Sequence, residues 1–295
     1  MKSPVTPLVI INPHSGSKKA HKFVALLQKS FPQLPFVVTE DREEYKRTLY
    51  NNADKYNTYI IAGGDGTINR AIPFFLEHPD KSLAVYPLGS GNGFAMELGF
   101  SKNFSRLLED IENGEKMKID VIQVGGKYSC NIAGIGLDGF IARLFVNQHS
   151  RGLKKYIGLT VNGLRQFTPF SAVLEAGQEM YEGTYMSMVF ANTRQFGNRA
   201  YIAPKALPND GKMTVVMILE MPPHKIVSFF FMLFSGKVDA HSHVKTLETH
   251  RSLQVKTTFP HAHVDGEPFT SPENVDIHIL PQAVSIIKTN RQKYL

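Results

Sequence analysis

The sequence predicts an α/β region followed by a mainly β region, and three observations support this fold class. The chain has 295 residues, enough for about two domains of ordinary size. In the first third, short apolar runs alternate with stretches of helical periodicity, as in a parallel sheet covered by helices. Beyond residue 119, apolar residues recur at every second position, which is typical of β-strands. We therefore expect domains over 1–119 and 120–295, and leave open that the extreme C-terminus returns to the first domain.

The elements of the α/β region follow from its apolar pattern. Continuous apolar runs predict strands, in chain order, at 7–11, 35–39, 59–62 and 83–87. Apolar residues three or four positions apart predict helices over 20–31, 68–75 and 104–111. In the β region, the alternation is clearest at Leu253 with Val255 and at Val275, Ile277 and Ile279.

Composition indicates a globular chain from a compartment where thiols stay reduced. Cys130 is the only cysteine, which excludes an internal disulfide and a cysteine-built metal cluster. The pairs His241/His243 and His261/His263 have a strand spacing that suits zinc, but they lack the partners of known zinc sites. Lys plus Arg number 33 against 26 for Asp plus Glu, so the net charge of +7 favours anionic partners. No reader motif accompanies that charge, which argues against nucleic acid.

The expected location is the cytoplasm, with contact to the inner face of the membrane left open. The apolar run near the N-terminus is too short for the core of a signal peptide. The most apolar stretch, 226–234, falls below the roughly 20 residues of a membrane-spanning helix, so it is able to touch a membrane but not to cross it. Its FFFMLF part fits either a core helix or a wall that admits an acyl chain. Basic residues within 127–174, among them Arg151, Lys154 and Lys155, fit a solvated face or a surface for phosphate or membrane.

Three polar turns follow three of the predicted strands, namely 12–16 (NPHSG), 63–69 (GGDGTIN) and 87–93 (PLGSGNG). The carboxyl ends of parallel strands share one sheet edge, so the turns are able to build one site. Glycines permit close backbone approach, and the N–H groups of turns and helix N-termini then face phosphate oxygens. A carboxylate among such donors indicates that Asp65 contacts Mg²⁺ on a nucleotide, the alternative being an N-cap or Asx turn. Thr67 and Asn69 likewise either cap the next helix or hold phosphate or ribose.

These motifs resemble those of the diacylglycerol kinase catalytic family, which includes bacterial lipid kinases and is similar to sphingosine and ceramide kinases. The similarity continues, in the family's order, with IDVIQV at 119–124, NIAGIGLDG at 131–139, IAPKALPNDGKM at 202–213 and VDGEP at 264–268. It implies an NAD-kinase-like, Rossmann-like nucleotide-binding domain and a C-terminal β-sandwich lipid domain, with the active site in the cleft between them. It also implies an ATP- and Mg²⁺-dependent lipid kinase, with diacylglycerol as the first expected acceptor.

The resemblance assigns ATP to the three turns, with help from the end of the second strand. The residues expected to bind ATP are Asn12, Ser15, Gly16, Thr39, Gly63, Gly64, Asp65, Gly66, Thr67, Ile68, Asn69, Gly89, Ser90, Gly91 and Asn92. A lipid substrate at a membrane surface is the expected partner, and a homodimer stays open.

The catalytic and metal roles also come from the resemblance. Glu267 resembles the family's proton acceptor, although an Asp-Gly hairpin outside the family would make it an ordinary turn glutamate. Asp120 resembles an acidic residue that organises the catalytic Mg²⁺ together with Asp65 and Glu267. The LPNDGK segment resembles a structural Mg²⁺ site, in which Asp210 supplies a carboxylate and Leu207 and Lys212 supply backbone carbonyls.

Two departures from the family pattern keep other functions open. Arg70 stands where the family usually has Glu, and Gly93 stands where its GTGND motif has Asp. The second change moves the turn toward the GSGN form, so a sphingoid-base or ceramide-type kinase is one alternative. An NAD kinase-like enzyme, which shares GGDGT, is another. A nucleotide-binding regulator that has lost catalysis is the non-enzymatic alternative.

Overall fold

The computed structural model describes residues 6–16, 19–146, 160 and 162–291. Contacts between Cα atoms divide the chain into two compact units. The first comprises Met1–Ile119 and Gln282–Leu295, and the second comprises Asp120–Pro281. Part of the basic segment (Arg151, Lys154 and Lys155) lies outside the described residues.

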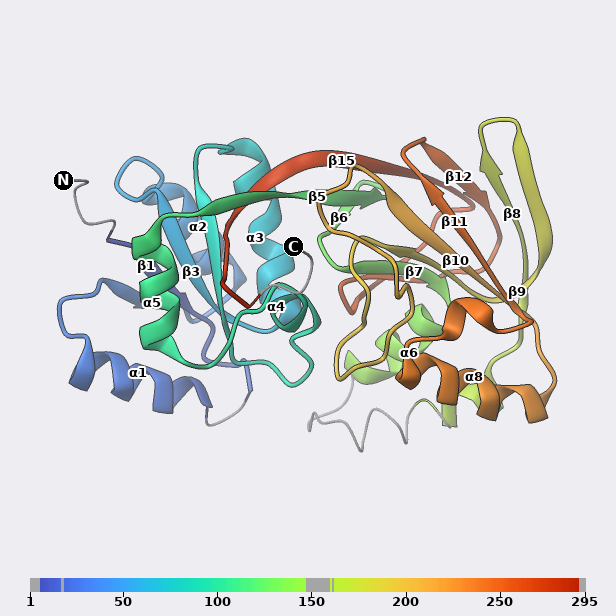
Figure 1. The fold of residues 1–295 in the computed structure, drawn as a ribbon, viewed down its shortest axis with the longest axis horizontal. Helices are drawn as coiled ribbons and strands as arrows, with labels where there is room; N and C mark the ends of the chain where they lie inside the picture. Colours follow the sequence, from blue (N-terminus) through green and yellow to red (C-terminus); the bar gives the residue numbers. More distant parts are fainter. Residues whose placement is uncertain (1–5, 17–18, 147–159, 161, 292–295) are drawn as a thin grey trace. The chain divides into compact units, whose positions relative to one another are not determined.

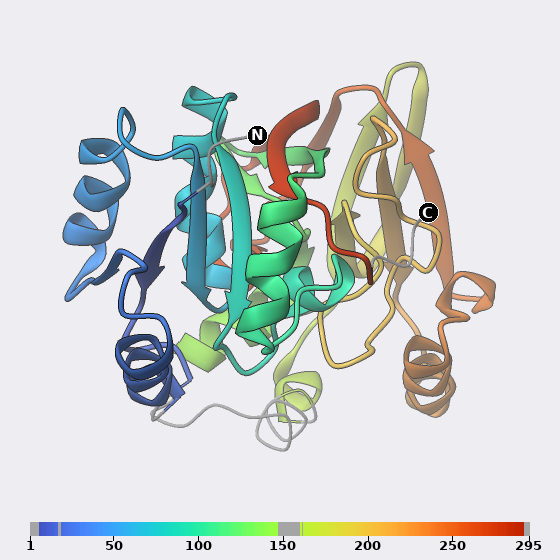
Figure 2. The ribbon, with the colours of Figure 1, turned by 60° about the vertical axis from the view of Figure 1, so that its left-hand side comes forward.

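The first unit is a parallel sheet with helices packed on it (Figure 1, Figure 2). The strand order is β15–β4–β3–β1–β2, and each of these pairs is parallel. The strands are β1 (Leu8–Ile11), β2 (Phe36–Val38), β3 (Thr58–Gly63), β4 (Ser82–Pro87) and the end of β15 (Asn274–Ile287). The helices are α1 (Lys19–Ser30), α2 (Arg42–Asn51), α3 (Asp65–Glu77), α4 (Gly93–Glu97) and α5 (Phe104–Asn113). The C-terminal segment therefore completes the sheet of the first unit.

The four strands and three helices expected in the α/β region are confirmed, and α2 and α4 are additional. The helix α2 buries only Tyr45 and Leu49, so its charged sequence carries too weak an apolar stripe to be recognised. It begins at an N-cap, where the Asp41 side chain accepts a hydrogen bond of 2.8 Å from the N–H of Glu44. The helix α4 spans five residues, less than two helical turns.

The second unit is built from antiparallel strands, as the period-two pattern predicts. Its main strand path is β14–β13–β7–β9–β8–β12–β15, while β10 pairs with β9 and β11, and β5 pairs with β6. The strands are β5 (Lys116–Val124), β6 (Lys127–Ser129), β7 (Ile132–Gly136), β8 (Phe170–Ala176), β9 (Glu179–Ala191), β10 (Met213–Leu219), β11 (Val244–Thr249), β12 (Leu253–Lys256), β13 (His261–Val264) and β14 (Glu267–Thr270). They are accompanied by α6 (Leu137–Val146), α8 (Pro223–Ser235) and the short 3₁₀ helix η1 (Val238–Ala240).

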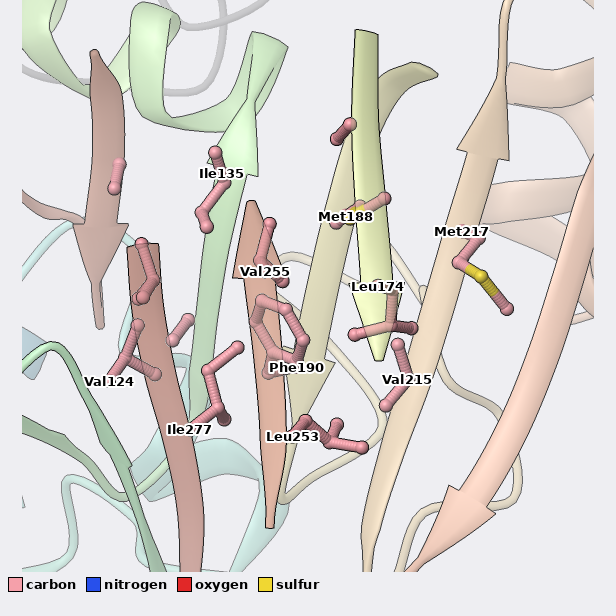
Figure 3. Packing of buried hydrophobic residues seen from close by; sticks show 14 of the residues in the cluster. Val124, Ile135, Leu174, Met188, Phe190, Val215, Met217, Leu253, Val255 and Ile277 are labelled. Carbon is pink, nitrogen blue, oxygen red and sulfur yellow. The ribbon is translucent and has the colours of Figure 1, made fainter. Parts of the chain in front are cut away.

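Alternate residues of the strands in the second unit enter two different hydrophobic clusters. Along β9, Met188 and Phe190 belong to the larger cluster shown in Figure 3, which also receives residues from β5, β8, β12 and β15. Val189 and Ala191 point to the other side of the sheet, where α8 covers the second cluster. This division follows from the side-chain alternation of a strand, and it gives the sheet two buried faces.

The apolar segment 226–234 lies in α8, and its two sides differ. Ile226 and Phe229 pack against the second cluster and Leu233 is 6% exposed, whereas Phe231 is 75% exposed. The interpretation as a core helix therefore holds for one side of α8 only. Among the described residues, no helix combines the length and apolar character that crossing a bilayer requires.

Candidate functional site

The three polar turns of the first unit lie together at the carboxyl edge of its parallel sheet. The first turn follows β1, the second follows β3 and the third follows β4, and these strands are neighbours in the sheet. The N–H of Asn12 donates to the carbonyl of Ala62 at 3.1 Å, and the N–H of Leu88 donates to the carbonyl of Gly63 at 2.9 Å. The turns are thus joined through backbone bonds where the strands end.

Thr67 connects the first turn to the second. Its Oγ1 accepts a hydrogen bond of 2.9 Å from Nδ2 of Asn12 and lies 3.2 Å from Oγ of Ser15. Thr67 is only 4% exposed, so these polar groups satisfy one another inside the unit. A Cβ on Gly63 would lie 2.5 Å from the Cβ of Thr67, which explains why this position has no side chain.

The backbone of Thr67 is also bound by α2, because the hydroxyl of Tyr45 donates to the carbonyl of Thr67 at 3.0 Å. Burial raises the pKa of Tyr45 well above its ordinary value, so the phenol stays protonated and remains a donor. The nearby positive charge of Arg70, one of the two departures from the family pattern, lowers the pKa of Tyr45 by a smaller amount. The helix α2, which the sequence did not reveal, therefore supports the second turn.

Asp65 connects the second turn to the third. Its two carboxylate oxygens accept hydrogen bonds from the N–H groups of Gly93 at 3.0 Å and Phe94 at 3.1 Å, at the start of α4. Asp65 itself is the first residue of α3, so its carboxylate caps a neighbouring helix rather than its own. In this structure these two N–H groups, at the N-terminus of α4, bind a carboxylate. The second departure, Gly93, thus supplies a backbone donor to Asp65.

Two further glycines permit the close approach of the turns. At Gly16, with φ of +68°, a Cβ would lie 1.9 Å from the carbonyl oxygen of Leu88. At Gly89, a Cβ would lie 2.7 Å from the Cα of Gly64, so these two backbones touch directly. Lys19 adds a long hydrogen bond of 3.4 Å from Nζ to the carbonyl of Gly89. The glycine spacing of the sequence thus reflects contacts between turns.

The remaining predicted ATP residues of the first unit differ in accessibility. Ser90 is exposed, and Gly66, Asn69 and Gly91 are half-buried. Thr39 is 3% exposed, and its hydroxyl donates to the carbonyl of Ile11 at 3.3 Å. Ile68 is fully buried in the core, and its N–H donates to the carbonyl of Gly64, so its side chain supports the helix rather than the surface of the turn.

Asn92 offers a buried acceptor at the third turn. Its backbone is left-handed, with φ of 52°, and its Nδ2 donates to the carbonyl of Gly89 at 2.9 Å. Its Oδ1 is buried and has no hydrogen-bond partner among the described residues. A buried acceptor without a partner is costly, and a ribose hydroxyl or a metal-bound water would supply the donor. The donor set of the turns therefore fits a nucleotide.

In the second unit, Asp265 anchors the hairpin that carries Glu267. Its Oδ1 accepts hydrogen bonds from Oγ of Ser129 at 2.6 Å and from the N–H groups of Asn131 and Ile132 at 3.0 Å each. Its Oδ2 accepts a further bond of 3.0 Å from the N–H of Cys130. Asp265 and Gly266 form the turn with positive φ at both positions, and Glu267 is the first residue of β14. The hydrogen bonds of Asp265 thus set the position of Glu267, two residues further along the chain.

A second set of buried contacts supports the same hairpin from its outer side. The N–H of Gly266 donates to Nδ1 of His263 at 3.2 Å, so the proton of the neutral ring lies on Nε2 and faces Asp138 at 3.1 Å. Ser187 donates to the other carboxylate oxygen of Asp138 at 3.1 Å. Because the serine contacts the aspartate and not the histidine, this is a structural network and not a nucleophilic triad. It accounts for His263 without zinc, and no sequence pattern indicates that Asp138 is its partner.

Asp120 and the LPNDGK segment come together in the second unit. The N–H of Asp120 donates to the carbonyl of Pro208 at 2.7 Å, and Oδ2 of Asp120 accepts from the N–H of Gly211 at 2.8 Å. Asp210 accepts a hydrogen bond of 3.0 Å from the N–H of Lys212. Thus the residue expected at the catalytic metal lies beside the segment expected to bind the structural metal.

Asn192, which the sequence did not single out, links Asp120 to the anchored hairpin. Its Nδ2 donates to the carbonyl oxygens of Asp120 at 2.8 Å and of Cys130 at 3.0 Å. Cys130 in turn donates its N–H to Asp265, the residue two positions before Glu267. The two acidic residues expected to act in catalysis within this unit are therefore tied to one buried hydrogen-bond network.

The oxygen-rich donors fit Mg²⁺ better than a softer metal. No group of three or more His, Cys, Asp or Glu side chains suited to a metal forms within the described parts of the chain. Mg²⁺ is usually held by one or two carboxylates, with carbonyl, phosphate or water oxygens completing its shell. Asp65 in the first unit, and Asp120 with Asp210 and the carbonyls of Leu207 and Lys212 in the second, have that chemistry.

The comparisons with known proteins cover nearly the whole chain. The model of the diacylglycerol kinase catalytic domain matches residues 6–124, and that of the YegS C-terminal NAD kinase beta sandwich-like domain matches residues 131–288. A diacylglycerol kinase from Mycobacterium tuberculosis is 26% identical over 95% of this chain and 94% of its own length. The "Probable lipid kinase YegS-like" of Shewanella frigidimarina is 26% identical over 80% of this chain and 77% of its own.

Solved structures show the same fold. A diacylglycerol kinase from Bacillus anthracis superposes with a TM-score of 0.71 at 17% identity, covering 97% of each chain. Yeast NADH kinase, crystallised with NADH, superposes with a TM-score of 0.56 at 12% identity, covering 99% of this chain and 86% of its own. The predicted fold class, an NAD-kinase-like α/β domain and a β-sandwich domain, is confirmed. Because the second family model alone matches more than half of the residues, the chain belongs to the family of diacylglycerol kinase-like and YegS-like lipid kinases.

Proposed function

We propose that this chain transfers the γ-phosphate of ATP to a lipid hydroxyl in the presence of Mg²⁺, with diacylglycerol as the acceptor. The observation that carries this proposal is the joining of three glycine-rich turns at one sheet edge, with Asp65 between the second and the third. Family membership supports kinase chemistry. The diacylglycerol named for the relative from Mycobacterium tuberculosis supports the choice of acceptor.

ATP binds, in this proposal, along the three turns of the first unit. Ser90 is exposed in the third turn and contributes a hydroxyl donor, while Asn92 contributes the buried amide oxygen that has no partner among the described residues. Close packing of Gly64 against Gly89 keeps side chains away from this edge, so phosphate oxygens approach the backbone directly. Lys19 adds a positive charge beside Gly89.

Glu267 acts as the proton acceptor. The acceptor hydroxyl loses its proton to the Glu267 carboxylate, a bond forms between its oxygen and the γ-phosphorus, and the bond from that phosphorus to the β,γ-bridging oxygen breaks as ADP leaves. Asp265 holds the hairpin through hydrogen bonds from Ser129, Cys130, Asn131 and Ile132, so Glu267 is presented by a rigid backbone. Mg²⁺, held by a carboxylate such as Asp65, would neutralise charge on the phosphates.

The test is phosphoryl transfer by the purified full-length chain. Labelled ATP and Mg²⁺ are incubated with detergent micelles that contain diacylglycerol, a sphingoid base or ceramide, and in parallel with NAD. Labelled phosphatidic acid is the expected product. Label only in another lipid would move the proposal to that acceptor class, label only in NAD would replace it with an NAD kinase activity, and ATP binding without transfer would indicate a regulator.

Glu267→Gln tests the assigned role of the carboxylate. The amide has nearly the same shape but accepts no proton, so turnover should fall by about a hundredfold or more while ATP affinity stays within a few-fold. Glu273→Gln, an exposed glutamate that follows β14, is the matched control and should retain full activity. Normal turnover of Glu267→Gln would remove Glu267 from the mechanism and leave the rest of the proposal standing.

A further inference from the structure

The helix α8 presents an apolar face that the second unit leaves uncovered. Val227 is 74% exposed, Phe231 is 75% exposed and Phe234 is 47% exposed. These residues are four and three positions apart, so they lie on one side of the helix. The opposite side packs on the second hydrophobic cluster through Ile226 and Phe229. Thus α8 is held firmly by one side while three large apolar side chains point outward.

Lysines lie at both ends of α8, and the helix itself carries no acidic residue. His224 and Lys225 lie in its first turn, Lys237 follows its C-terminal cap at Gly236, and no acidic residue occurs from Met221 to Val238. The next residue, Asp239, is paired with Lys205 at 2.9 Å. The exposed apolar face therefore lies between lysines at the two ends of the helix, while of the two acids that flank this stretch Glu220 is exposed and Asp239 is paired with Lys205.

Tyr201 and Arg194 lie beside the C-terminal end of α8. The N–H of Tyr201 donates to the carbonyl of Leu233 at 3.0 Å, which attaches Tyr201 to the last turn of the helix. The guanidinium of Arg194 lies over the ring of Tyr201, 5.9 Å from its centre. The last turn of α8 is thus joined to the segment that carries Arg194 and Tyr201.

We propose that α8 is the surface by which this protein docks on an anionic lipid bilayer, lying in the plane of the interface. An apolar face bordered by lysines is the pattern of helices that rest at the boundary between headgroups and acyl chains. The helix has 13 residues, about 20 Å of helix, which is too short to cross but long enough to lie flat. A protein partner would need acidic groups around an apolar groove, whereas an anionic bilayer supplies both features over its whole surface.

The helix α8 is connected through packed residues to the hairpin that carries Glu267. The cluster beneath α8 includes Ile132 of β7 and packs against Leu137, the first residue of α6. The next residue, Asp138, holds His263 and with it the turn before Glu267. Figure 1 shows α6 and α8 at the same edge of the second unit. Docking through α8 would bring the bilayer to the side of the sheet that α6 covers, and α6 supports the turn before Glu267 through Asp138. The inference therefore rests on the proposed lipid kinase function.

The absence of tryptophan from the chain makes a direct test possible. Phe231→Trp places a single indole on the proposed face, and Met180→Trp places one at a 65% exposed position in the second unit away from α8. With vesicles of phosphatidylcholine and phosphatidylglycerol, the emission of Phe231→Trp should shift to the blue and be quenched by brominated acyl chains. The emission of Met180→Trp should not change. Equal responses of the two variants, or none from Phe231→Trp, would overturn the proposal.

Sedimentation with the same vesicles tests the contributions of the apolar face and of the lysines at its ends. The double variant Val227→Ser/Phe231→Ser should lower the partition coefficient by roughly tenfold or more, and Lys225→Glu/Lys237→Glu should do so on anionic vesicles. Met180→Ser and Arg251→Glu are the exposed controls and should bind like the parent chain. Unchanged binding by both double variants, with the thermal midpoint preserved, would refute the assignment.

Two other results distinguish bilayer docking from dimerisation through α8 and from the lipid kinase proposal. If the parent chain is a dimer by light scattering and Phe231→Ser makes it a monomer with no vesicle binding in either form, a second copy covers α8 and the proposal is wrong. Vesicle binding needs no ATP, so binding through α8 without any phosphoryl transfer would support docking while the lipid kinase function fails. If the chain phosphorylates lipid in micelles but its vesicle binding does not depend on α8, the lipid kinase function stands and docking through α8 is wrong.

Discussion

Replacing Asp265 by Asn is the sharpest test of how the second unit positions Glu267. Asparagine has the same shape and tolerates the left-handed backbone, with φ of 49°, so the change isolates the charge and one acceptor. With the amide oxygen in the place of Oδ1, the NH₂ group faces the N–H of Cys130, which loses its bond to Oδ2. The bonds from Ser129, Asn131 and Ile132 to Oδ1 remain but lose their ionic character.

The expected cost can be worked out from these contacts. A buried donor left unsatisfied costs about 1–3 kcal/mol, and a hydrogen bond to a charged group exceeds a neutral one by roughly 0.5–1 kcal/mol. With one lost bond and three weakened ones, we expect a local destabilisation of about 3–5 kcal/mol, which is roughly a hundredfold or more in the equilibrium for opening the hairpin. Phosphoryl transfer should fall with it, because Glu267 is carried by the same hairpin.

Amide hydrogen exchange is the appropriate measurement, because a chain with two compact units need not unfold in one step. Peptides that cover 129–132 and 261–270 should exchange faster by roughly a hundredfold in Asp265→Asn. The matched control is Asp276→Asn, where an exposed carboxylate accepts a single bond from Gln254, and it should change exchange little. Protection of 129–132 within about threefold of the parent chain would refute the reasoning.

Three further predictions concern the remaining structure. Gly16→Ala should destabilise the first unit by about 2–4 kcal/mol and weaken ATP binding in calorimetry, because the added Cβ would lie 1.9 Å from the carbonyl oxygen of Leu88 at a positive φ; unchanged thermal stability and affinity would contradict this. Asp65→Ala should lower phosphoryl transfer by about a hundredfold or more and also loosen α4, seen as faster exchange at 93–97; near-normal turnover would exclude Asp65 from the mechanism. Burial, and to a smaller extent His243, lowers the pKa of His241, so the unfolded chain takes up the proton first and stability is lost as pH falls from the unfolded pKa toward the folded one. The midpoint of unfolding should therefore drop on acidification through that window in the parent chain and drop less in His241→Gln, and identical pH profiles would contradict the assignment.

The strands and turns of the first unit could be predicted because their signals are local. A continuous apolar run such as 59–62 predicts a buried strand whatever its neighbours are, and a glycine-rich turn that follows it marks the carboxyl edge of the sheet. The helix α2 escaped detection because it buries only two side chains. Its role depends on Tyr45 reaching the carbonyl of Thr67, 22 residues away in the sequence.

By itself, the sequence determined the two-part fold, the three turns and the residues by which the family is recognised. Only the tertiary structure decided that Asp65 caps α4, that Asp265 gathers 129–132 around its carboxylate and that Phe231 faces outward. The physical reason is that periodicity and turn chemistry act between residues a few positions apart. A carboxylate, by contrast, binds whichever N–H groups the fold brings to it, here from residues 28 and 134 positions away.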